Sequence, residues 1–285
     1  VPSHTIGETI TAAHGSNKIS ITTASTSDST YPYRGEAGTQ ATLVRGFSGD
    51  SVITSTSSLE LNDITMDGNS GSYTGGLAGG LVKMNGSATP TLTLSGDTKL
   101  MNSALDNDDN ALGGGSVYLD DNCSLGMVDQ ATIENCTSST NGGAIATGKS
   151  ATVELSNNAT IQSCEAQGLG GAIFTDSDTT LRVRGNALLG DDNTSDNVDK
   201  GNKAWGTSET SGRGGAIHAE KSTVVLSGNA KIAGNYAQNG GGGINYAGDT
   251  KRGLIISNDA TIAYNTSDAD GGGIRAATTG TVDLP

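Results

Sequence analysis

The sequence predicts an all-β fold, a right-handed parallel β-helix (a solenoid) with three strands per coil and about nine coils. Two observations lead to this prediction. A short glycine phrase recurs through most of the chain, and the segments between its copies keep their apolar residues in the same phase. In addition, no segment carries apolar residues at helical spacing over the length of an amphipathic helix.

The glycine phrase opens the first strand of each coil. "GGAI" or a close variant recurs, and most copies are 27 to 35 residues apart. Glycine adopts a positive φ without steric cost, so we expect the first glycine to turn a tight corner. The Val or Ile that follows is expected to point into the core. The first glycines are Gly79, Gly114, Gly142, Gly170, Gly214, Gly241 and Gly271.

Two further strands complete each coil, and both alternate apolar with polar residues. The second contains pairs such as Val153 and Leu155, or Val224 and Leu226. The third contributes one large apolar residue. Coils stacked at the strand spacing of about 4.8 Å make a rod about 45 Å long. The apolar residues of the third strand are Leu100, Ile133, Ile161, Ile232 and Ile262.

A ladder of short side chains is expected three residues after the apolar residue of the third strand. Asparagine there can bond backbone groups of its own and neighbouring coils. Cys136 and Cys164 occupy successive positions, where they either stack as free buried thiols or form a disulfide. Neither has the CxxC spacing or adjacent histidine of a metal or catalytic site. The ladder positions are Asn69, Ser103, Cys136, Cys164, Asp192, Asn235 and Asn265.

Composition argues against several classes of protein. The chain has 43 glycines among 285 residues and is 33% hydrophobic, but a disordered chain has no reason to keep apolar positions in register. A net charge of -14 argues against binding to nucleic acids and to anionic membranes. No apolar run reaches about 18 residues, so we expect no direct membrane insertion.

Two regions are expected along the chain. Residues 1–50 show little regular pattern and are predicted to form an N-terminal cap with irregular early coils. Residues 51–285 are predicted to form the β-helix. The final "GTVDLP" stops partway through a coil, which predicts that the β-helix is truncated at its C-terminal end and comes from a longer protein.

One coil is longer than its neighbours. The interval from Gly170 to Gly214 is 44 residues, and the excess lies in residues 191–213. Insertions in repeat proteins often form a binding face. This one contains the only tryptophan, Trp205, which either covers an apolar patch of its own coil or contributes to a ligand site.

The residue after the Val or Ile of each glycine phrase forms an outward column. Phe174 and His218 occupy this column in the coils that flank the insertion, and Tyr118 occupies it earlier in the chain. If Trp205 lies over the column, the four side chains form an aromatic cluster suited to sugar stacking or protein contact. Trp205, Phe174, His218 and Tyr118 are therefore the predicted ligand-binding residues.

The inserted segment is also rich in carboxylates. Asp191, Asp192, Asp196 and Asp199 offer the oxygen ligands that Ca²⁺ takes in proteins. Their spacing matches no EF-hand loop, because glycine is missing at the required place. The alternative is that these side chains are solvated and the protein has no cofactor.

Catalytic residues are not indicated. The three histidines are far apart in sequence, and no glycine pattern frames a serine as a nucleophile elbow. Stacking aligns Asp120, Asp176 and Glu220, but acidic residues at turns are usually solvated. We therefore expect no enzyme. The alternative is a carbohydrate-active β-helix enzyme, a polysaccharide lyase or hydrolase with clustered carboxylates.

The repeated phrases resemble those of a known family. "GGAI" alternates with "IxxN", as in "IAGN" at 232–235 and "IAYN" at 262–265, and "SVITSTSSLELNDITMDGN" at 51–69 looks like an early coil. These phrases are similar to the repeats of the chlamydial polymorphic membrane proteins and of other large bacterial surface proteins. Here Ile replaces the Phe usual in the chlamydial phrase, and Cys136 and Cys164 replace Asn.

The resemblance implies a non-catalytic adhesin segment. It implies an extracellular location at the cell surface, either cell-wall-anchored or autotransported, and a host surface protein or glycan as partner. The segment is expected to be a monomeric part of a larger surface protein. The remaining alternative is a pure structural stalk that binds nothing.

Overall fold

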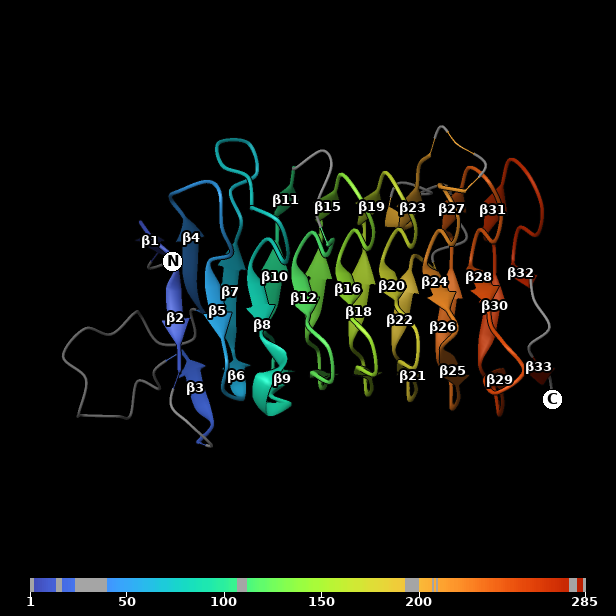
Figure 1. Ribbon diagram of the computed structural model, residues 1–285, viewed down its shortest axis with the longest axis horizontal. Helices are drawn as coiled ribbons and strands as arrows, with labels where there is room; N and C mark the ends of the chain where they lie inside the picture. The colour runs from blue at the N-terminus through green and yellow to red at the C-terminus, as the bar shows by residue number, and fades with distance from the viewer. Residues whose placement is uncertain are drawn as a thin grey trace.

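The protein is a parallel β-helix built from three long sheets and one short sheet. The computed structural model describes residues 3–13, 17–23, 40–106, 112–192, 200–206, 208, 210–276 and 281–283. Within these residues each of the three long sheets has nine strands and every pairing between strands is parallel, which confirms the predicted all-β solenoid of about nine coils. Figure 1 shows the coils side by side along the long axis, with the two termini at opposite ends.

The strands that follow the glycine phrases belong to sheet B, together with two earlier strands. The strands pair in register, so the first apolar residue of one strand lies beside the equivalent residue in the next coil, as Ile145 lies beside Ile173. The strands of sheet B are β2 (Ile10–Ala12), β5 (Ile53–Ser55), β8 (Val82–Met84), β12 (Val117–Leu119), β16 (Ile145–Thr147), β20 (Ile173–Thr175), β24 (Ile217–Glu220), β28 (Ile244–Ala247) and β32 (Ile274–Ala276).

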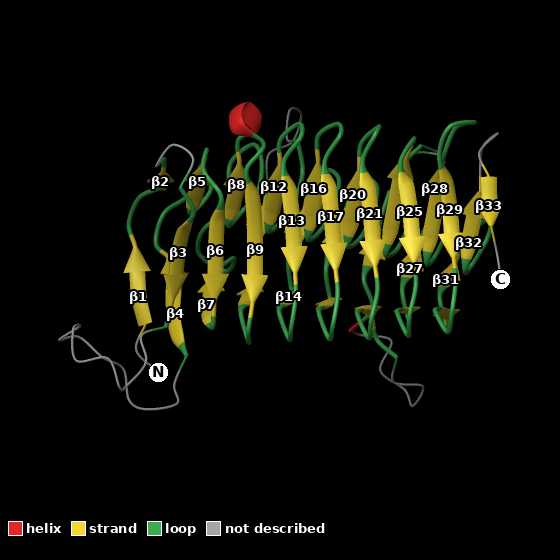
Figure 2. Cartoon of the chain, turned by 90° about the horizontal axis from the view of Figure 1, so that it is seen from below, coloured by secondary structure: helices red, strands yellow, loops and turns green. Residues whose placement is uncertain are grey.

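The second strand of each coil belongs to sheet C, whose members lie side by side in Figure 2. Alternation is regular here, because Val153 and Leu155 are buried while the residues next to them in the strand are half-buried. The strands of sheet C are β3 (Ile19–Thr22), β6 (Leu59–Asn62), β9 (Thr91–Ser95), β13 (Ser124–Met127), β17 (Thr152–Leu155), β21 (Thr180–Val183), β25 (Thr223–Leu226), β29 (Gly253–Ile256) and β33 (Thr281–Asp283). A short 3₁₀ helix, η1 (Gly86–Ala88), precedes β9.

The third strand of each coil belongs to sheet A. Its central residue points inward, as the buried Ile133 and Ile161 do. The strands of sheet A are β1 (Ser3–Ile6), β4 (Ala41–Arg45), β7 (Ile64–Asp67), β10 (Lys99–Met101), β14 (Thr132–Glu134), β18 (Thr160–Gln162), β22 (Leu188–Gly190), β26 (Lys231–Ala233) and β30 (Thr261–Ala263).

A fourth sheet, sheet D, lies between sheets A and B in six coils and was not predicted. Its strands have two residues each, and in Figure 1 they lie along the upper edge of the solenoid. The first residue of each strand points outward and the second inward. The strands are β11 (Ala104–Leu105), β15 (Thr137–Ser138), β19 (Glu165–Ala166), β23 (Lys203–Ala204), β27 (Tyr236–Ala237) and β31 (Thr266–Ser267).

The core is a continuous column of aliphatic side chains enclosed by sheets A, B and C. Like stacks on like, so one residue position is filled by Ile in several successive coils. Each fully buried aliphatic side chain contributes about 1.5–3 kcal/mol, an upper estimate because the unfolded chain is not fully extended. The apolar residues of the glycine phrase within this core are Val82, Val117, Ile145, Ile173, Ile217 and Ile244.

The two glycines of the phrase have different roles. Gly170 has a φ of 69°, which confirms the predicted corner. Gly171 is required for a different reason, because a Cβ there would lie 2.2 Å from the oxygen of Gly215 and 2.5 Å from the carbonyl carbon of Lys203. The second glycine thus lets the start of sheet B pack directly against sheet D of the next coil.

The described residues before position 50 already belong to the solenoid. Strands β1 to β4 pair with later strands in the same three long sheets. The buried Arg45 at the end of β4 donates from Nη1 to the oxygens of Asp50 (2.9 Å) and Thr74 (3.1 Å). For residues 1–50 the sequence predicted a cap with irregular early coils, and the described part of this region forms coils that continue into the same sheets.

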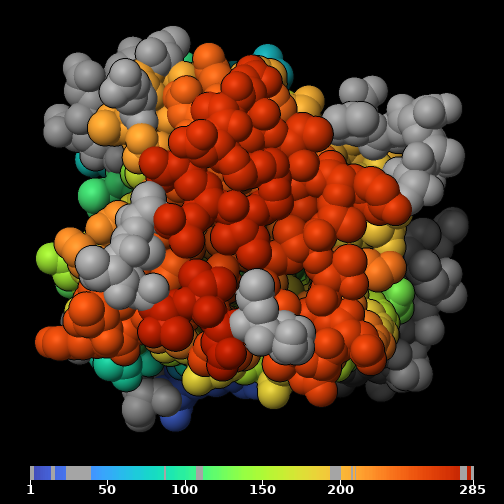
Figure 3. Space-filling view, turned by 90° about the vertical axis from the view of Figure 1, so that its right-hand side faces the viewer, coloured from blue at the N-terminus to red at the C-terminus, as the bar shows by residue number. Residues whose placement is uncertain are grey.

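The cross-section can be seen from the C-terminal end. In Figure 3 the atoms of the last coils, in orange and red, face the viewer and cover the coils behind them.

No helix in the described part of the chain has the length and apolar character needed to cross a membrane.

The second glycine of the phrase provides a test of the packing. We expect Gly171→Ala to destabilise the protein by about 2–3 kcal/mol, because the added Cβ overlaps two backbone segments. Gly126→Ala is the matched control, since a Cβ on this strand residue of β13 meets no atom within 4 Å. Thermal unfolding followed by circular dichroism measures both, and equal melting temperatures for the two variants would contradict the packing described here.

Candidate functional site

The predicted outward column lies in register on sheet B. Tyr118 pairs with Ala146, Ala146 with Phe174, Phe174 with His218, and His218 with Asn245. However, the side chains are not exposed: Tyr118 is 6% and His218 is 3% exposed. The column points away from the main core, but Tyr118 and His218 are buried rather than exposed, and Phe174 is half-buried.

The column is covered by the segments that connect sheet D to sheet B. These return segments stack on one another, with a parallel bridge between Leu169 and Arg213 and a hydrogen bond from the nitrogen of Gly142 to the oxygen of Leu169 (2.9 Å). Beneath them lies a second, smaller apolar cluster. It consists of Ala78, Tyr118 and Ala146, with Phe174 packed against it. A surface ligand therefore has no open access to Tyr118 or His218.

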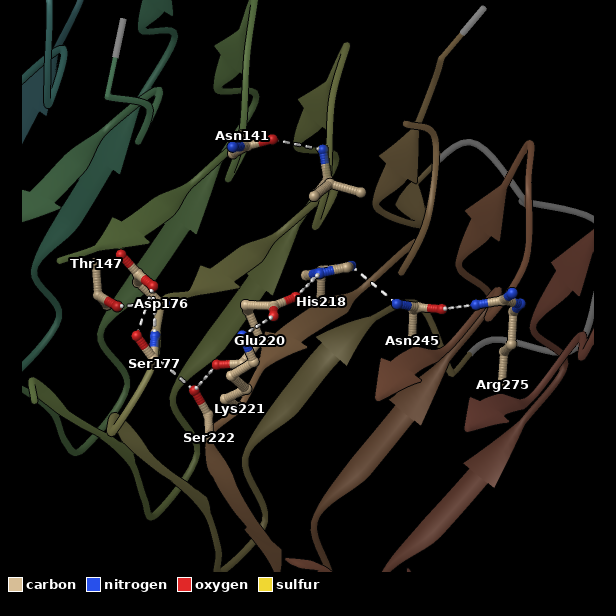
Figure 4. A network of polar contacts seen from close by, with 11 residues as sticks. Asn141, Thr147, Asp176, Ser177, His218, Glu220, Lys221, Ser222, Asn245 and Arg275 are labelled. Carbon is tan, nitrogen blue, oxygen red and sulfur yellow. Dashed lines mark hydrogen bonds and ion pairs between the residues drawn. The ribbon is translucent and has the colours of Figure 1, made fainter. Parts of the chain in front are cut away.

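His218 is instead part of a polar row that crosses three adjacent strands of sheet B (Figure 4). Arg275 donates from Nη1 to Oδ1 of Asn245 (3.0 Å), which leaves Nδ2 of Asn245 to donate to Nδ1 of His218 (3.0 Å). A neutral His218 ring therefore carries its proton on Nε2. That nitrogen lies 3.7 Å from Oε2 of Glu220, an ion-pair distance that is longer than a hydrogen bond.

Burial dominates the protonation of this row. It lowers the pKa of His218, and Arg213 and Arg275 lower it further, while Glu220 opposes the shift. The pKa of Glu220 is lowered, first by its contact with His218. Burial thus favours the neutral His218 ring, while the contact with His218 favours the Glu220 carboxylate against the opposing effect of its own burial on its pKa.

The other carboxylates of the predicted acidic column are bound at turns. Asp176 accepts hydrogen bonds from the nitrogen and the Oγ of Ser177 (2.6 and 3.0 Å), as Figure 4 shows. Asp120 accepts from the nitrogens of Gly86 (3.4 Å) and Asp121 (3.0 Å). Their contacts are those of turn residues rather than of a catalytic pair.

The asparagine ladder is present, with one correction. The nitrogen of Cys164 donates to Oδ1 of Asn202, that of Asn202 to Asn235, and that of Asn235 to Asn265, each at 3.0 Å. The Nδ2 atom of each Asn donates to a carbonyl of the preceding coil. Asp192 was predicted for the place that Asn202 occupies, and this was wrong. The accepting carbonyls are those of Ile161, Leu189 and Ile232.

The earlier ladder positions are also filled as predicted. Asn69 donates from Nδ2 to the oxygen of Arg45 (3.2 Å). Cys136 and Cys164 are free and buried, which decides between the two alternatives in favour of stacked thiols. Each thiol donates to a backbone carbonyl two residues earlier, and burial raises the pKa of Cys164. Both thus behave as small buried core residues.

The long coil contains two insertions rather than one. Asn202 follows Leu189 by 13 residues, where Cys164 follows Ile161 by three. The return segment after Asn202 is also longer by six residues than the one after Cys164. Between the two insertions the chain rejoins the solenoid as β23. The first insertion lies between Leu189 and the ladder residue, so the ladder residue is Asn202 and not Asp192, which follows Leu189 by three residues.

The calcium prediction is not tested by the described residues. Asp192 forms an ion pair with Lys231 (2.7 Å), and Asp196 and Asp199 lie outside the described residues, while Asp191 is described. Within the described ranges, no group of three or more His, Cys, Asp or Glu side chains converges as a metal site does.

Trp205 lies on sheet D and not over the sheet B column. Its ring contacts that of Tyr236 on the next coil, with centroids 4.8 Å apart. Phe174 stacks on His218 instead, at 5.7 Å. The four predicted ligand-binding residues are therefore divided between two faces, and only Trp205 belongs to the outer face of sheet D.

The outer face of sheet D carries a groove, which we call the sheet D groove. It is a cavity of about 350 Å³ over β11, β15 and β19, bordered by the return segment that follows β7. The ladder of backbone hydrogen bonds continues from this cavity to Trp205, whose nitrogen donates to the oxygen of Ala166 (2.8 Å). The polar residues that line the cavity include Ser70, Thr74, Thr137, Ser139, Glu165 and Gln167.

Sequence reasoning missed sheet D because two-residue strands carry almost no periodicity. One signal was present, since a small residue recurs two positions after the ladder residue. The recurring small residues are Ser138, Ala166, Ala204, Ala237 and Ser267. Read with the ladder, they mark a second inward position and so a short strand.

Comparison with known proteins gave no relative. No protein-family model, no curated protein and no solved structure matched the chain.

The amide ladder predicts a large cost for one buried side chain. Asn235→Ala removes the acceptor for Asn202 and the donor for two buried carbonyls, so we expect a loss of about 2–4 kcal/mol. Asn229→Ala is the control, because this exposed Asn donates only to Asn186 and should cost under about 0.5 kcal/mol. Urea unfolding measures both, and similar midpoints would refute the ladder's role.

The buried His218 predicts a specific dependence of stability on pH. Its pKa is lowered in the folded state, so below about pH 6.5 the unfolded chain binds a proton that the folded protein resists. As the pH decreases below this value, the free energy of unfolding should fall by up to about 1.4 kcal/mol per pH unit. The variant His218→Gln should lose this dependence of the unfolding free energy on pH, and the control variant His4→Gln, at an exposed position, should keep it. Urea unfolding at several pH values between 5 and 8 measures both, and the same pH dependence in the two variants would contradict the prediction.

Proposed function

We propose that this chain is a non-catalytic, surface-displayed adhesin segment of a bacterial protein, and that it binds a host glycoprotein or glycan. The β-helix serves as a stiff support that carries a binding face on its outside. The segment is extracellular and forms part of a larger cell-surface protein, attached to the cell wall or autotransported. The polymorphic-membrane-protein type of repeat is part of this proposal.

One observation carries the proposal. Where the repeat is interrupted, an aromatic pair, Trp205 and Tyr236, lies half-buried on the outer face of the solenoid. Large aromatic side chains at the surface are unusual in a chain with 4% aromatic residues, and they are the residues that binding sites favour. A spacer has no need of them.

The buried histidine favours binding over catalysis. His218 lies 3.7 Å from Glu220, the one His–carboxylate contact within 4 Å among the described residues, and only 3% of His218 is exposed. A general acid or base must reach the substrate within hydrogen-bonding distance. A role for His218 as the general base of an enzyme is therefore not supported, and the carboxylates Asp120 and Asp176 are bound at turns.

Direct binding to host material tests the function. The folded chain, labelled and applied to an array of host glycoproteins and free glycans, should bind a subset of them and lose binding on thermal unfolding. Treating bound glycoproteins with glycosidases separates recognition of the glycan from recognition of the polypeptide.

Two controls separate the alternatives. Binding to no member of the array would indicate a structural stalk. New reducing ends or unsaturated products after incubation with polysaccharides would indicate an enzyme, and either result would refute the proposal.

A further inference from the structure

We propose that an uncharged oligosaccharide binds along the outer face of sheet D, parallel to the solenoid axis, where it fills the sheet D groove and stacks on Trp205 and Tyr236 in the following coils. This inference rests on the proposed function and assigns its site and its ligand class.

The groove repeats along the axis. Two outward columns follow sheet D, one through Glu165, Lys203 and Tyr236, the other through Gln167 and Trp205. Successive coils are about 4.8 Å apart, a length comparable with that of one sugar ring. A sugar chain lying along the axis therefore meets a new pair of side chains at each ring.

The aromatic pair offers an apolar surface held in place. The rings of Trp205 and Tyr236 are inclined at 48°, so they form an angled wall rather than a parallel stack. The Oη of Tyr236 donates to Oδ2 of Asp268 (2.5 Å), which fixes its ring. Burial and this carboxylate raise the pKa of Tyr236 to about 12, so the phenol stays protonated. The C–H face of a sugar ring is apolar and matches the electron-rich aromatic face.

The cavity beside the aromatic pair supplies polar groups of the right kind. Hydroxyl and amide side chains both donate and accept, as sugar hydroxyls do. Its volume of about 350 Å³ lies at the lower end of the range for small-molecule sites, which suits one or two sugar rings. The hydroxyl and amide groups are those of Ser70, Thr74, Thr137, Ser139 and Gln167.

The charges of the groove select an uncharged ligand. Asp106 and Glu165 line the cavity, and Asp268 stands beside Tyr236. The one cation in the two columns, Lys203, is paired with Glu165 at 3.5 Å. Three carboxylates and one cation leave a net negative charge there, which would repel a sialylated or sulfated glycan, while sugar hydroxyls can donate to the carboxylates.

The single tryptophan makes the site directly observable. Because Trp205 is the only tryptophan of the chain, its fluorescence reports the sheet D groove alone. The chain is first applied to an array of uncharged, sialylated and sulfated oligosaccharides. The strongest uncharged and the strongest anionic members are then titrated while the Trp205 emission is recorded.

We expect uncharged oligosaccharides to bind and to shift the Trp205 emission, with affinity that changes little between low and high salt. Trp205→Ala should weaken binding about tenfold or more, and Gln167→Ala about threefold. Trp205→Phe should retain part of the affinity. Tyr264→Ala is the matched control, because Tyr264 is 68% exposed and lies outside the groove, and it should bind like the wild type.

The outcomes separate this inference from the proposed function. If the chain binds host glycans while Trp205→Ala binds equally well, the adhesin role stands and the site is wrong. If only anionic glycans or a basic peptide bind, the ligand class is wrong. If neither glycans nor host glycoproteins bind the wild-type chain, both proposals fail. Circular dichroism of each variant confirms that lost binding is not lost folding.

Discussion

The structure depends on one constraint, which is that each coil must return the chain to the same place one strand spacing further along the axis. Parallel hydrogen bonds then join every strand to the equivalent strand of the next coil. A side chain such as Ile173 consequently packs between copies of itself, Ile145 and Ile217. The corner glycines, the core and the amide ladder are all solutions that this return imposes on each coil.

The sequence predicted those features that depend on residues close together in the chain, and it missed those that depend on distant segments. The corner at Gly170 and the core position of Ile173 depend on residues close in sequence, so repetition reveals them. The ladder place of Asn202 depends on where an insertion begins, and counting along the chain could not locate it. The burial of His218 was missed because alternation assigns its side to solvent, and only the fold-back of a return segment covers it.

Repetition also indicates where function can differ between coils. Sheets A, B and C use their inward residues for the core, and the outer side of sheet B is partly covered by the return segments. From β15 onward the inward residues of sheet D are small and its outward positions are half-buried or exposed, so the outward side chains can change without disturbing the stack. The succession Thr137, Glu165, Lys203, Tyr236 shows this freedom, because four chemically different residues share one backbone position.

The asparagine ladder gives the rod a direction. The backbone nitrogen of Asn202 is satisfied only by the side chain of Asn235, and that of Asn235 only by Asn265, so each coil is completed by the coil that follows it. When the chain folds from its N-terminus, the coils from Cys164 to Asn235 therefore each expose an unfilled donor until the next coil forms. In this part of the rod assembly has a direction, because each coil is joined to its predecessor at a short sequence distance and with a small loss of loop entropy.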